Sequence, residues 1–196
     1  DVTKKGSAEK VMNSAILNFG GIDILISNAG NATSGMMLEL DDKKLRKAFE
    51  LNFFAHKSFA VEAAKIMKLQ NRGGQILFNI SKQAINPGSN MGAYGLPKAT
   101  TMFLMRQLAL ELGSNKIRVN GINADRIRSG LLTDNFISER SKSRGISEQV
   151  YMEGNLLKQE VEAKHVAEGF RALAQMKRTT GHILTVDGGN TAAELR

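Results

Sequence analysis

The sequence predicts an α/β fold in which helices cover both faces of a parallel β-sheet, that is, a doubly wound sheet. The first observation is that short apolar runs, typical of strands buried on both faces, alternate with longer segments of helical periodicity. The second is that this helix–strand alternation recurs along the whole chain, with no internal repeat or linker to divide it. Right-handed crossovers are therefore expected between neighbouring strands.

The first half of the chain supplies two predicted helical regions and two predicted strands. Ser7 is the candidate cap of the first helix, and Asp41 is the candidate cap of the second. The apolar run that ends at Ser27 has the pattern of a strand covered on both faces. The predicted elements are a helix at 7–18, a strand at 22–27, a long helix at 41–69 and a strand at 75–80.

The second half continues the alternation. A helix rich in Ala, Leu and Met is predicted to begin near Gly95, which places Pro97 in its first turn, where a missing N–H costs little. Residues 133–155 are polar and weakly patterned, and we interpret them as a mobile substrate lid. The other predicted elements are a helix at 95–113, a strand at 117–122, a helix at 161–176 and a strand at 181–186.

Polar residues follow three of the predicted strands. Asn28 comes directly after the first strand, Ser81 after the second, and a polar segment follows Ile122 at the end of the third. Ligands of doubly wound sheets bind at the carboxyl ends of the strands. The sequence therefore predicts that these residues meet at one site.

Tyr94 and Lys98 are four residues apart, which puts their side chains on one face of a helix. An ammonium beside a phenol favours the phenolate, so the pKa of Tyr94 is expected to fall from about 10 toward neutrality. Such a tyrosine can act as a general acid or base, and the Ser81 hydroxyl can donate to an oxygen that gains charge. The spacing alone also describes a solvent-facing pair.

Asn52 is a polar residue in an otherwise apolar stretch of the long helix, between Leu51 and Phe53. From the residues alone it can be a functional side chain or a buried asparagine whose hydrogen bonds are satisfied.

Composition excludes several classes of function. The 196 residues include no cysteine, so disulfides and thiolate chemistry are absent. The net charge of +8 is spread over the chain and aromatic residues are sparse, so a nucleic-acid partner is not expected. The three histidines are far apart in sequence, so no metal site is expected. No apolar run suits a membrane span, and we expect a cytoplasmic protein with no membrane partner.

In order and spacing along nearly the whole chain, several residues resemble those of the classical short-chain dehydrogenase/reductase family. They are Ser81, Tyr94, Lys98, Asn52 and the run Asn28–Ala29–Gly30. The resemblance implies a Rossmann-like fold over residues 1–196, an NAD or NADP cofactor, and hydride transfer between nicotinamide and a small alcohol, carbonyl or sugar-derived substrate. It also implies a tetrad. In that tetrad Tyr94 is the acid or base, Lys98 lowers its pKa, Ser81 orients the substrate oxygen and Asn52 anchors a water.

The same resemblance implies a set of cofactor-binding residues. Tyr94 and Lys98 face the nicotinamide ribose, and Ser129 takes the place of a threonine that holds the nicotinamide carboxamide. The family usually has Pro-Gly shortly before that threonine, whereas this chain has Ala124–Asp125. The remaining residues of the set contact the adenine or line the cofactor, namely Asp1, Val2, Asn28, Ala29 and Gly30.

One departure from the family concerns its glycine-rich turn, which receives the pyrophosphate and which we do not find before Asp1. We interpret Gly88, Gly92 and Gly95 as turn residues and not as a substitute. The chain is expected to be the C-terminal two-thirds to three-quarters of the domain. We then expect an apolar sheet edge at 22–27 and weak dinucleotide binding by these residues alone.

The loops around Ser81 and before Tyr94 are similar to those of one subgroup, the bifunctional rhamnulose-1-phosphate aldolase/alcohol dehydrogenases. By resemblance, the helices at 41–69 and 93–113 form the face of a homodimer or homotetramer. The enoyl-reductase branch separates Tyr and Lys by six residues, so the spacing here favours the alcohol branch. The alternative function is a binding or scaffold protein that kept the fold and lost catalysis. The residues do not choose between NAD and NADP.

Overall fold

A computed structural model describes residues 1–190, and the last six residues of the predicted domain, 191–196, lie outside the described part. One parallel sheet forms the centre, with strand order β1-β2-β3-β4. Its strands are β1 (Ile24–Ser27), β2 (Gly74–Asn79), β3 (Ile117–Ala124) and β4 (Ile183–Val186). The predicted α/β class and parallel sheet are confirmed.

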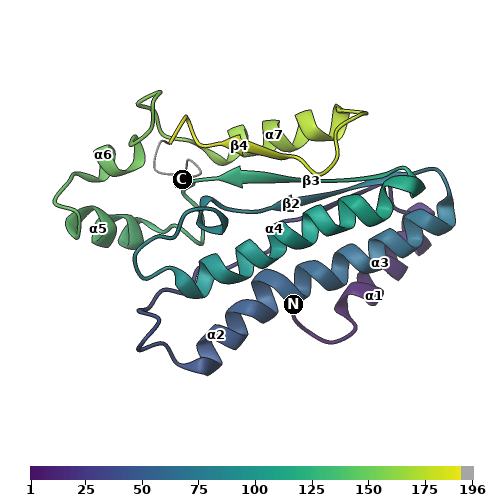
Figure 1. Ribbon diagram of the computed structural model, residues 1–196, viewed down its shortest axis with the longest axis horizontal. Helices are drawn as coiled ribbons and strands as arrows, with labels where there is room; N and C mark the ends of the chain where they lie inside the picture. Colours follow the sequence, from purple (N-terminus) through teal and green to yellow (C-terminus); the bar gives the residue numbers. More distant parts are fainter. Residues whose placement is uncertain (191–196) are drawn as a thin grey trace.

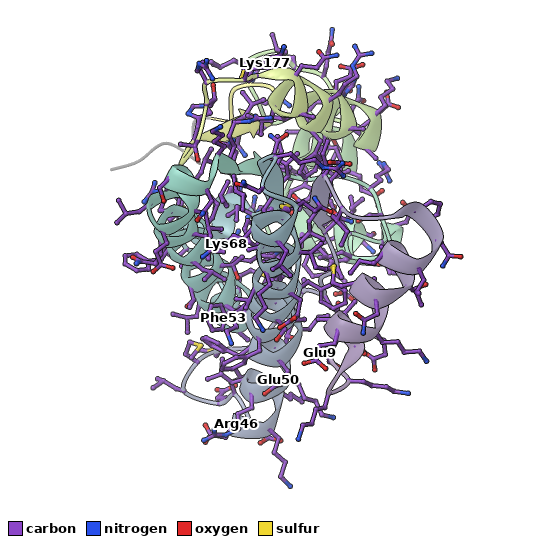
Figure 2. The ribbon with its side chains drawn as sticks, turned by 90° about the vertical axis from the view of Figure 1, so that its right-hand side faces the viewer. Glu9, Arg46, Glu50, Phe53, Lys68 and Lys177 are labelled. Carbon is purple, nitrogen blue, oxygen red and sulfur yellow. The ribbon has the colours of Figure 1, made fainter. Side chains whose placement is uncertain are left out.

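Helices cover both faces of this sheet (Figure 1). Viewed at right angles, α4, α3 and α1 lie side by side beneath the sheet, and α7 lies above it (Figure 2). Alternate residues of β2 point to the two layers, because Ile76 and Phe78 belong to the larger core cluster and Leu77 belongs to the cluster with Phe170 of α7. The bounds are Ser7–Phe19 for α1, Ala55–Gln70 for α3, Gly92–Leu112 for α4 and Ala163–Gln175 for α7.

Strand β1 differs from the prediction that both its faces are covered. Ile24 is 48% exposed and Ile26 is 51% exposed, whereas Leu25 packs against the larger core cluster. The reason is topological, since β1 lies at the edge of the sheet and only the face toward α1 and α3 is covered by described residues. The exposed apolar edge predicted for residues 22–27 is confirmed.

The long helix predicted at 41–69 is divided by a π-helical turn. Asp41 caps α2 (Asp42–Phe49) by accepting a hydrogen bond from Lys43 N, as predicted. The π-helical turn η1 (Glu50–Phe54) follows and leads into α3. The cap predicted for α1 is wrong, because Gly6 holds the capping position and the Ser7 hydroxyl donates to the Asp1 carbonyl.

Helix α4 begins at Gly92, three residues before the predicted start. Pro97 therefore lies in the second turn and not the first, and it has no N–H to donate to the Ala93 carbonyl. The interpretation of Gly92 and Gly95 as turn residues is wrong for the same reason, because both are helical.

The segment at 133–155 is folded, although its sequence is weakly patterned. It contains α5 (Asp134–Lys142) and α6 (Glu148–Met152), which pack around their own small cluster of Leu132, Ile137, Tyr151 and Met152. Hydroxyl caps at Thr133 and Ser147 start these short helices. Both helices lie at the end of the sheet where the strands finish (Figure 1). None of the helices described in residues 1–190 is long and apolar enough to cross a membrane.

Candidate functional site

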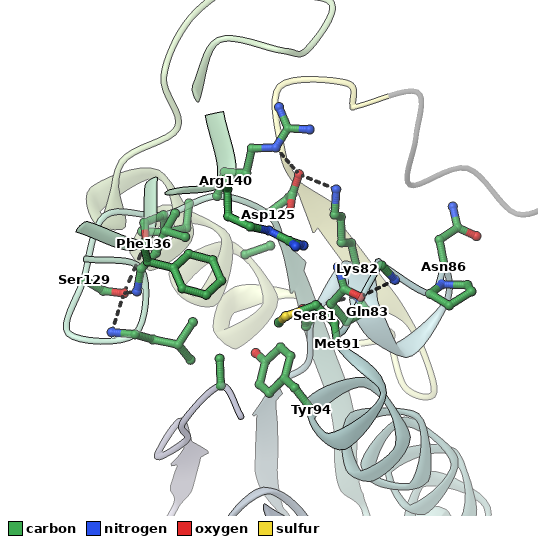
Figure 3. Close-up of a pocket in the computed structure, with 18 of the residues that line it drawn as sticks. Ser81, Lys82, Gln83, Asn86, Met91, Tyr94, Asp125, Ser129, Phe136 and Arg140 are labelled. Atoms are coloured by element: carbon green, nitrogen blue, oxygen red, sulfur yellow. Dashed lines mark hydrogen bonds and ion pairs between the residues drawn. The ribbon is translucent and has the colours of Figure 1, made fainter. Parts of the chain in front are cut away.

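The loops that follow β2 and β3 enclose a cavity of about 360 Å³ together with the start of α4 and the α5–α6 segment. Ser81, Tyr94 and Ser129 all line it. Figure 3 shows Tyr94 beside Ser81, with Phe136 and Arg140 across the cavity. Asn28, on the loop after β1, is tied to the same edge through a 2.6 Å hydrogen bond from Asn79 Nδ2 to its Oδ1. The three strand ends therefore lie at one edge of the sheet, although Asn28 does not line this cavity.

Tyr94 and Lys98 lie on one face of α4, as their spacing predicts. Lys98 Nζ is 5.8 Å from the centroid of the Tyr94 ring. The lysine is buried, and its Nζ donates to the Asn79 carbonyl at 2.8 Å. No ion pair found in residues 1–190 involves Lys98. Burial lowers the pKa of Lys98 to about 8. A hydrogen-bond acceptor or negative charge placed beside Nζ would therefore stabilise the ammonium form.

The pKa of Tyr94 moves in the direction opposite to the prediction. Burial of the phenol raises its pKa, and the negative charge of Asp125 adds to the increase. A hydrogen-bonding interaction with the Ser81 side chain lowers the pKa but is outweighed by burial. In this structure Tyr94 is therefore a neutral phenol near neutral pH, the form that can donate a proton.

The position of Ser81 depends on close packing of the segment that follows β2 against α4. Ser81 caps a short 3₁₀ helix, η2 (Lys82–Ala84), and its hydroxyl accepts from Gln83 N at 3.2 Å. A Cβ atom on Gly95 would lie 2.9 Å from the Gln83 carbonyl oxygen. Only glycine permits this approach without a shift, so Gly95 helps to hold Ser81 beside Tyr94.

Asn52 lies in the π-helical turn η1 and is fully buried. Its Nδ2 donates to the Asn31 carbonyl at 2.9 Å and to the Ala48 carbonyl at 3.1 Å. Its backbone carbonyl accepts from the Thr101 hydroxyl of α4 at 2.7 Å. The side chain thus fixes the loop after β1, which matches the satisfied buried asparagine of the two alternatives. The predicted water-anchoring role stays a prediction.

The loop Asn28–Ala29–Gly30 is exposed and lies directly beside Asn52 and Lys98. A Cβ on Gly30 would lie 3.0 Å from Asn52 Oδ1 and 3.6 Å from Lys98 Nζ. Glycine here lets the exposed loop pass close to both buried polar groups.

A second cavity, of about 260 Å³, lies along the exposed edge of β1. Val2, Asn28 and Ala29 line it together with apolar side chains such as Ile26. Asp1 does not line it, and its carboxylate instead accepts from Thr3 N at 2.9 Å and from the Thr3 hydroxyl at 2.8 Å. The predicted cofactor residues are thus divided, with Val2 beside Asn28 and Ala29 but Asp1 turned into its own loop.

Ser129 lines the larger cavity, but its hydroxyl is engaged in its own turn. The hydroxyl donates to the Ile127 carbonyl at 3.2 Å and accepts from Leu131 N and Leu132 N, each at 3.3 Å. A contact with a bound amide would have to replace or share these bonds.

Asp125 lines the larger cavity and was not among the site residues predicted from the sequence. Its carboxylate pairs with Lys82 Nζ at 3.1 Å (Figure 3). It also pairs with Arg126 Nε at 3.3 Å and accepts from the Asn190 amide. The only signal was the departure from Pro-Gly at Ala124–Asp125, which indicated altered loop geometry but not an ionic cluster.

His56 is a second residue for which the sequence predicted no role. Its Nδ1 is 2.6 Å from the Ser27 hydroxyl, and its buried Nε2 has no hydrogen-bond partner among the described atoms. Burial, together with the charge of Lys98, lowers the pKa of His56 to about 3, so the ring is neutral. Across the described residues no three His, Asp or Glu side chains gather as they would around a metal ion.

The residues around Lys98 fit the ribose and nicotinamide half of a dinucleotide. Lys98 uses one of its three N–H groups within the described part, and its buried Nζ lies just behind Gly30 of the exposed loop. An ammonium with spare donors can bind the hydroxyl oxygens of a ribose. A glycine-rich turn for the pyrophosphate is not found in the 196 residues, so the fit concerns this half alone.

Comparison with known proteins agrees with this geometry. A family model described as enoyl-(acyl carrier protein) reductase matches residues 1–191. The uncharacterized oxidoreductase YuxG of Bacillus subtilis is 35% identical over all of this chain, which covers only 30% of YuxG. The 7alpha-hydroxysteroid dehydrogenase of Escherichia coli K12 is 30% identical over 96% of this chain and 71% of that protein.

A solved structure extends the likeness to three dimensions. The L-sorbose reductase of Gluconobacter frateurii, in complex with NADPH and L-sorbose, is 28% identical and superposes with a TM-score of 0.86. The match covers 97% of this chain and 74% of the reductase. With a family model matched over residues 1–191 and a fold shared with this reductase, the chain belongs to the short-chain dehydrogenase/reductase family.

Proposed function

We propose that this chain forms the catalytic part of an NAD- or NADP-dependent oxidoreductase that acts on a small alcohol or carbonyl compound. The observation that carries the proposal is the position of Tyr94, a buried neutral phenol that contacts Ser81 and opens onto the 360 Å³ cavity above a buried lysine. A nicotinamide cofactor supplies or accepts the hydride when bound. The NADPH bound by the sorbose reductase supports this class of cofactor.

In the direction of reduction, Ser81 and Tyr94 hold the substrate carbonyl oxygen between their hydroxyls. Ser81 donates a hydrogen bond to that oxygen as it gains negative charge. Tyr94 gives its phenolic proton to the oxygen and becomes a phenolate; the alcohol is complete once the carbonyl carbon has also received the hydride that a bound nicotinamide would supply. The Lys98 ammonium, 5.8 Å from the ring centroid, stabilises that phenolate. Oxidation follows the same path in reverse.

Other residues position these groups. Asn52 and Asn79 hold the loop Asn28–Ala29–Gly30, which we assign to the nicotinamide half of the cofactor. Asp1, Val2 and Ser129 complete the proposed cofactor contacts, although Ser129 must first exchange hydrogen bonds. Four statements stay predictions. They are that residues 1–196 form one dinucleotide-binding domain, that residues 133–155 act as a lid, that the protein is cytoplasmic, and that it is similar to the aldolase-fused dehydrogenases.

The experiment is a double-mutant cycle in the full-length protein with Ser81→Ala, Tyr94→Phe and the double variant. Because the two hydroxyls act on one oxygen, the Tyr94→Phe change should lower kcat roughly 100-fold or more, and the second change should add much less than its own single effect. Fully additive effects, or a double variant with near-normal kcat, would contradict a shared role.

The alternative is a binding protein that retains the fold without catalysis. The family model's description makes enoyl reduction a further candidate. A substrate panel for the wild-type protein should therefore include secondary alcohols, ketones and an enoyl thioester. Turnover of the alcohols or ketones supports the proposal, whereas turnover of the enoyl thioester alone, or of nothing, refutes it.

We also propose that α3 and α4 form a homodimer face. Large apolar side chains are exposed on these helices, with Leu69 at 87%, Phe103 at 69% and Leu110 at 79%. Burial of such side chains in a second copy is favourable. Light scattering of Phe103→Glu should show a smaller species than the wild type, and an unchanged mass would refute this face.

A further inference from the structure

The larger cavity carries a strong excess of positive charge. Its lining residues include four cationic side chains, Lys82, Arg126, Arg140 and Arg144, and a single carboxylate, Asp125. Asp125 is shared between Lys82 and Arg126. The charges of Arg140 and Arg144 are therefore not balanced by any carboxylate on the cavity wall.

Arg140 and Arg144 are also without ion pairs elsewhere in residues 1–190. The guanidinium carbon of Arg140 lies 5.7 Å from the Phe136 ring centroid, and that of Arg144 lies 5.1 Å from the Tyr151 ring centroid. Arg140 Nη1 donates to the Ser89 carbonyl at 3.2 Å, while its Nε is buried without a partner in the described part. Aromatic rings and one carbonyl thus place these groups and leave their charge available.

Arg128, a neighbouring arginine, is neutralised by two carboxylates. Arg128 Nη1 lies 2.6 Å from Asp134 Oδ1, and its Nε lies 2.7 Å from Glu160 Oε1. Arg128 does not line the cavity. Arg128, outside the cavity, is paired twice, and Arg126 on the cavity wall shares Asp125, whereas Arg140 and Arg144 on that wall are not paired with a carboxylate.

The end of α5 offers a structural explanation that accounts for only part of this pattern. Cations in the last turn of a helix interact favourably with its dipole, and both Arg140 and Lys142 lie in that turn. Lys142 is exposed and does not line the cavity. The dipole explains why a cation is favoured there, but it does not require a guanidinium that lines the cavity with a buried, unpartnered Nε.

Building on the oxidoreductase function proposed above, we propose that the substrate carries an oxyanion, a carboxylate or a phosphate, which binds Arg140 and Arg144 while Ser81 and Tyr94 engage its carbonyl or hydroxyl group. The planar fork of arginine suits the two oxygens of such a group. Figure 3 shows Arg140 and Tyr94 on opposite sides of the cavity, so one small molecule can contact both. The cavity of about 360 Å³ is large enough for a short carbon chain between them.

The kinetic test compares matched anionic and neutral probes in the full-length protein with NAD or NADP at constant ionic strength. The pairs are 3-hydroxybutyrate with 3-hydroxybutyramide, and glycerol 3-phosphate with glycerol. The wild type should favour one anion over its neutral partner by about tenfold or more in kcat/KM. The preferred pair distinguishes carboxylate from phosphate.

The Arg140→Gln variant should lose this preference through a higher KM for the anion, with little change in kcat. Arg140→Lys should retain part of it, because the charge remains while the fork is lost. Lys142→Gln is the matched control, since it removes a charge from the same helix outside the cavity, and it should keep the full preference. Equal use of anionic and neutral probes, or an unchanged preference in Arg140→Gln, overturns the proposal while leaving the oxidoreductase function intact.

A binding measurement separates this proposal from the function on which it rests. Calorimetric titration with inorganic phosphate and with acetate should detect binding of at least one of them to the wild type and to Lys142→Gln, but not to Arg140→Gln. That pattern supports the anion site even if no probe is turned over. Absence of binding for both anions, or equal binding to all three proteins, overturns it.

Discussion

The two walls of the larger cavity differ in how they are built. One wall comes from the end of β2 and the start of α4 and carries Ser81 and Tyr94, with Lys98 buried behind them. The other comes from the loop after β3 and the two short helices α5 and α6, and it carries Asp125, Arg140 and Arg144. The first is tied into the central core, whereas the second packs around a small cluster of its own.

This difference indicates that proton transfer and substrate recognition are assigned to different walls of the cavity. Groups that move a proton must hold fixed positions, and long core elements provide them. Groups that recognise a substrate can differ between relatives without disturbing those positions, and a peripheral segment allows that. Changes in the first wall should therefore affect turnover, and changes in the second should affect which molecules are bound.

The largest effect among these tests is expected for Lys98→Met. The change removes the cation behind Tyr94 and the donors assigned to the cofactor ribose, so turnover of the full-length protein should fall roughly 100-fold. Steady-state assays check this, with exposed Lys142→Met as the control. Turnover within a few-fold of the wild type would show that the first wall does not depend on this cation.

Lys98→Met should also change how stability depends on pH. The pKa of Lys98 is about 8 in the folded chain and 10.5 in the reference state, so the unfolded chain binds more protons between these values. The free energy of unfolding should therefore rise with pH from about 8 to 10.5, by on the order of 3 kcal/mol from this group. Urea titrations should show that rise in the wild type and a flatter profile in the variant.

The next effect concerns the contact that holds Ser81. In Gly95→Ala the new methyl group would meet the Gln83 carbonyl, so stability should fall by about 1–3 kcal/mol and turnover should drop with it. Gly113→Ala is a matched control, because a Cβ there has nothing within 4 Å. Thermal unfolding and kcat check both. Equal behaviour of the two variants would mean that close packing at Gly95 does not position the first wall.

His56 lies behind the first wall, and its protonation should make the folded chain less stable in acid. Its pKa is about 3 in the folded chain and 6.5 in the reference state, so only the unfolded chain gains this proton as the pH falls through that range. Stability should therefore fall between pH 6.5 and 3, by on the order of 5 kcal/mol from this group. His56→Leu should reduce that slope and exposed His182→Gln should keep it; the reverse result would assign the slope to another group.

The smallest effect is expected for Asp125→Asn, which tests whether the two walls interact electrostatically. Asp125 raises the pKa of Tyr94, so Asp125→Asn should lower that pKa. The chain has two tyrosines and no tryptophan, so ultraviolet difference titration with and without Tyr94→Phe isolates this phenol. An unchanged titration would show that the walls are electrostatically independent.

The sequence predicted the first wall well because its signals are periodic and local. The apolar run of β2, the spacing of Tyr94 and Lys98, and Ser81 at a strand end all follow from elementary patterns. The start of α4 was placed too late, because glycines at 92 and 95 are read as turns when their packing partners are unknown. The direction of the Tyr94 pKa was missed because burial of the phenol depends on the whole fold.

The ionic groups of the second wall were not predicted because their positions depend on tertiary contacts, although residues 133–155 were interpreted as a lid and Ser129 as a cofactor contact. Helices α5 and α6 are short, and their apolar residues pack in a small cluster with Leu131 and Leu132. The cluster around Asp125 joins Lys82, Arg126 and Asn190, which are distant in sequence apart from its direct neighbour. The π-helical turn at Asn52 was hidden within a continuous helical pattern for the same reason.

The most direct test of the proton-transfer role is the pre-steady-state rate of hydride transfer in full-length Tyr94→Phe, followed by nicotinamide absorbance with saturating cofactor and alcohol. We predict a rate at least about 100-fold below the wild type, with cofactor affinity little changed, because the variant loses the phenolic proton and keeps the ring. A rate within a few-fold of the wild type would contradict the role assigned to Tyr94.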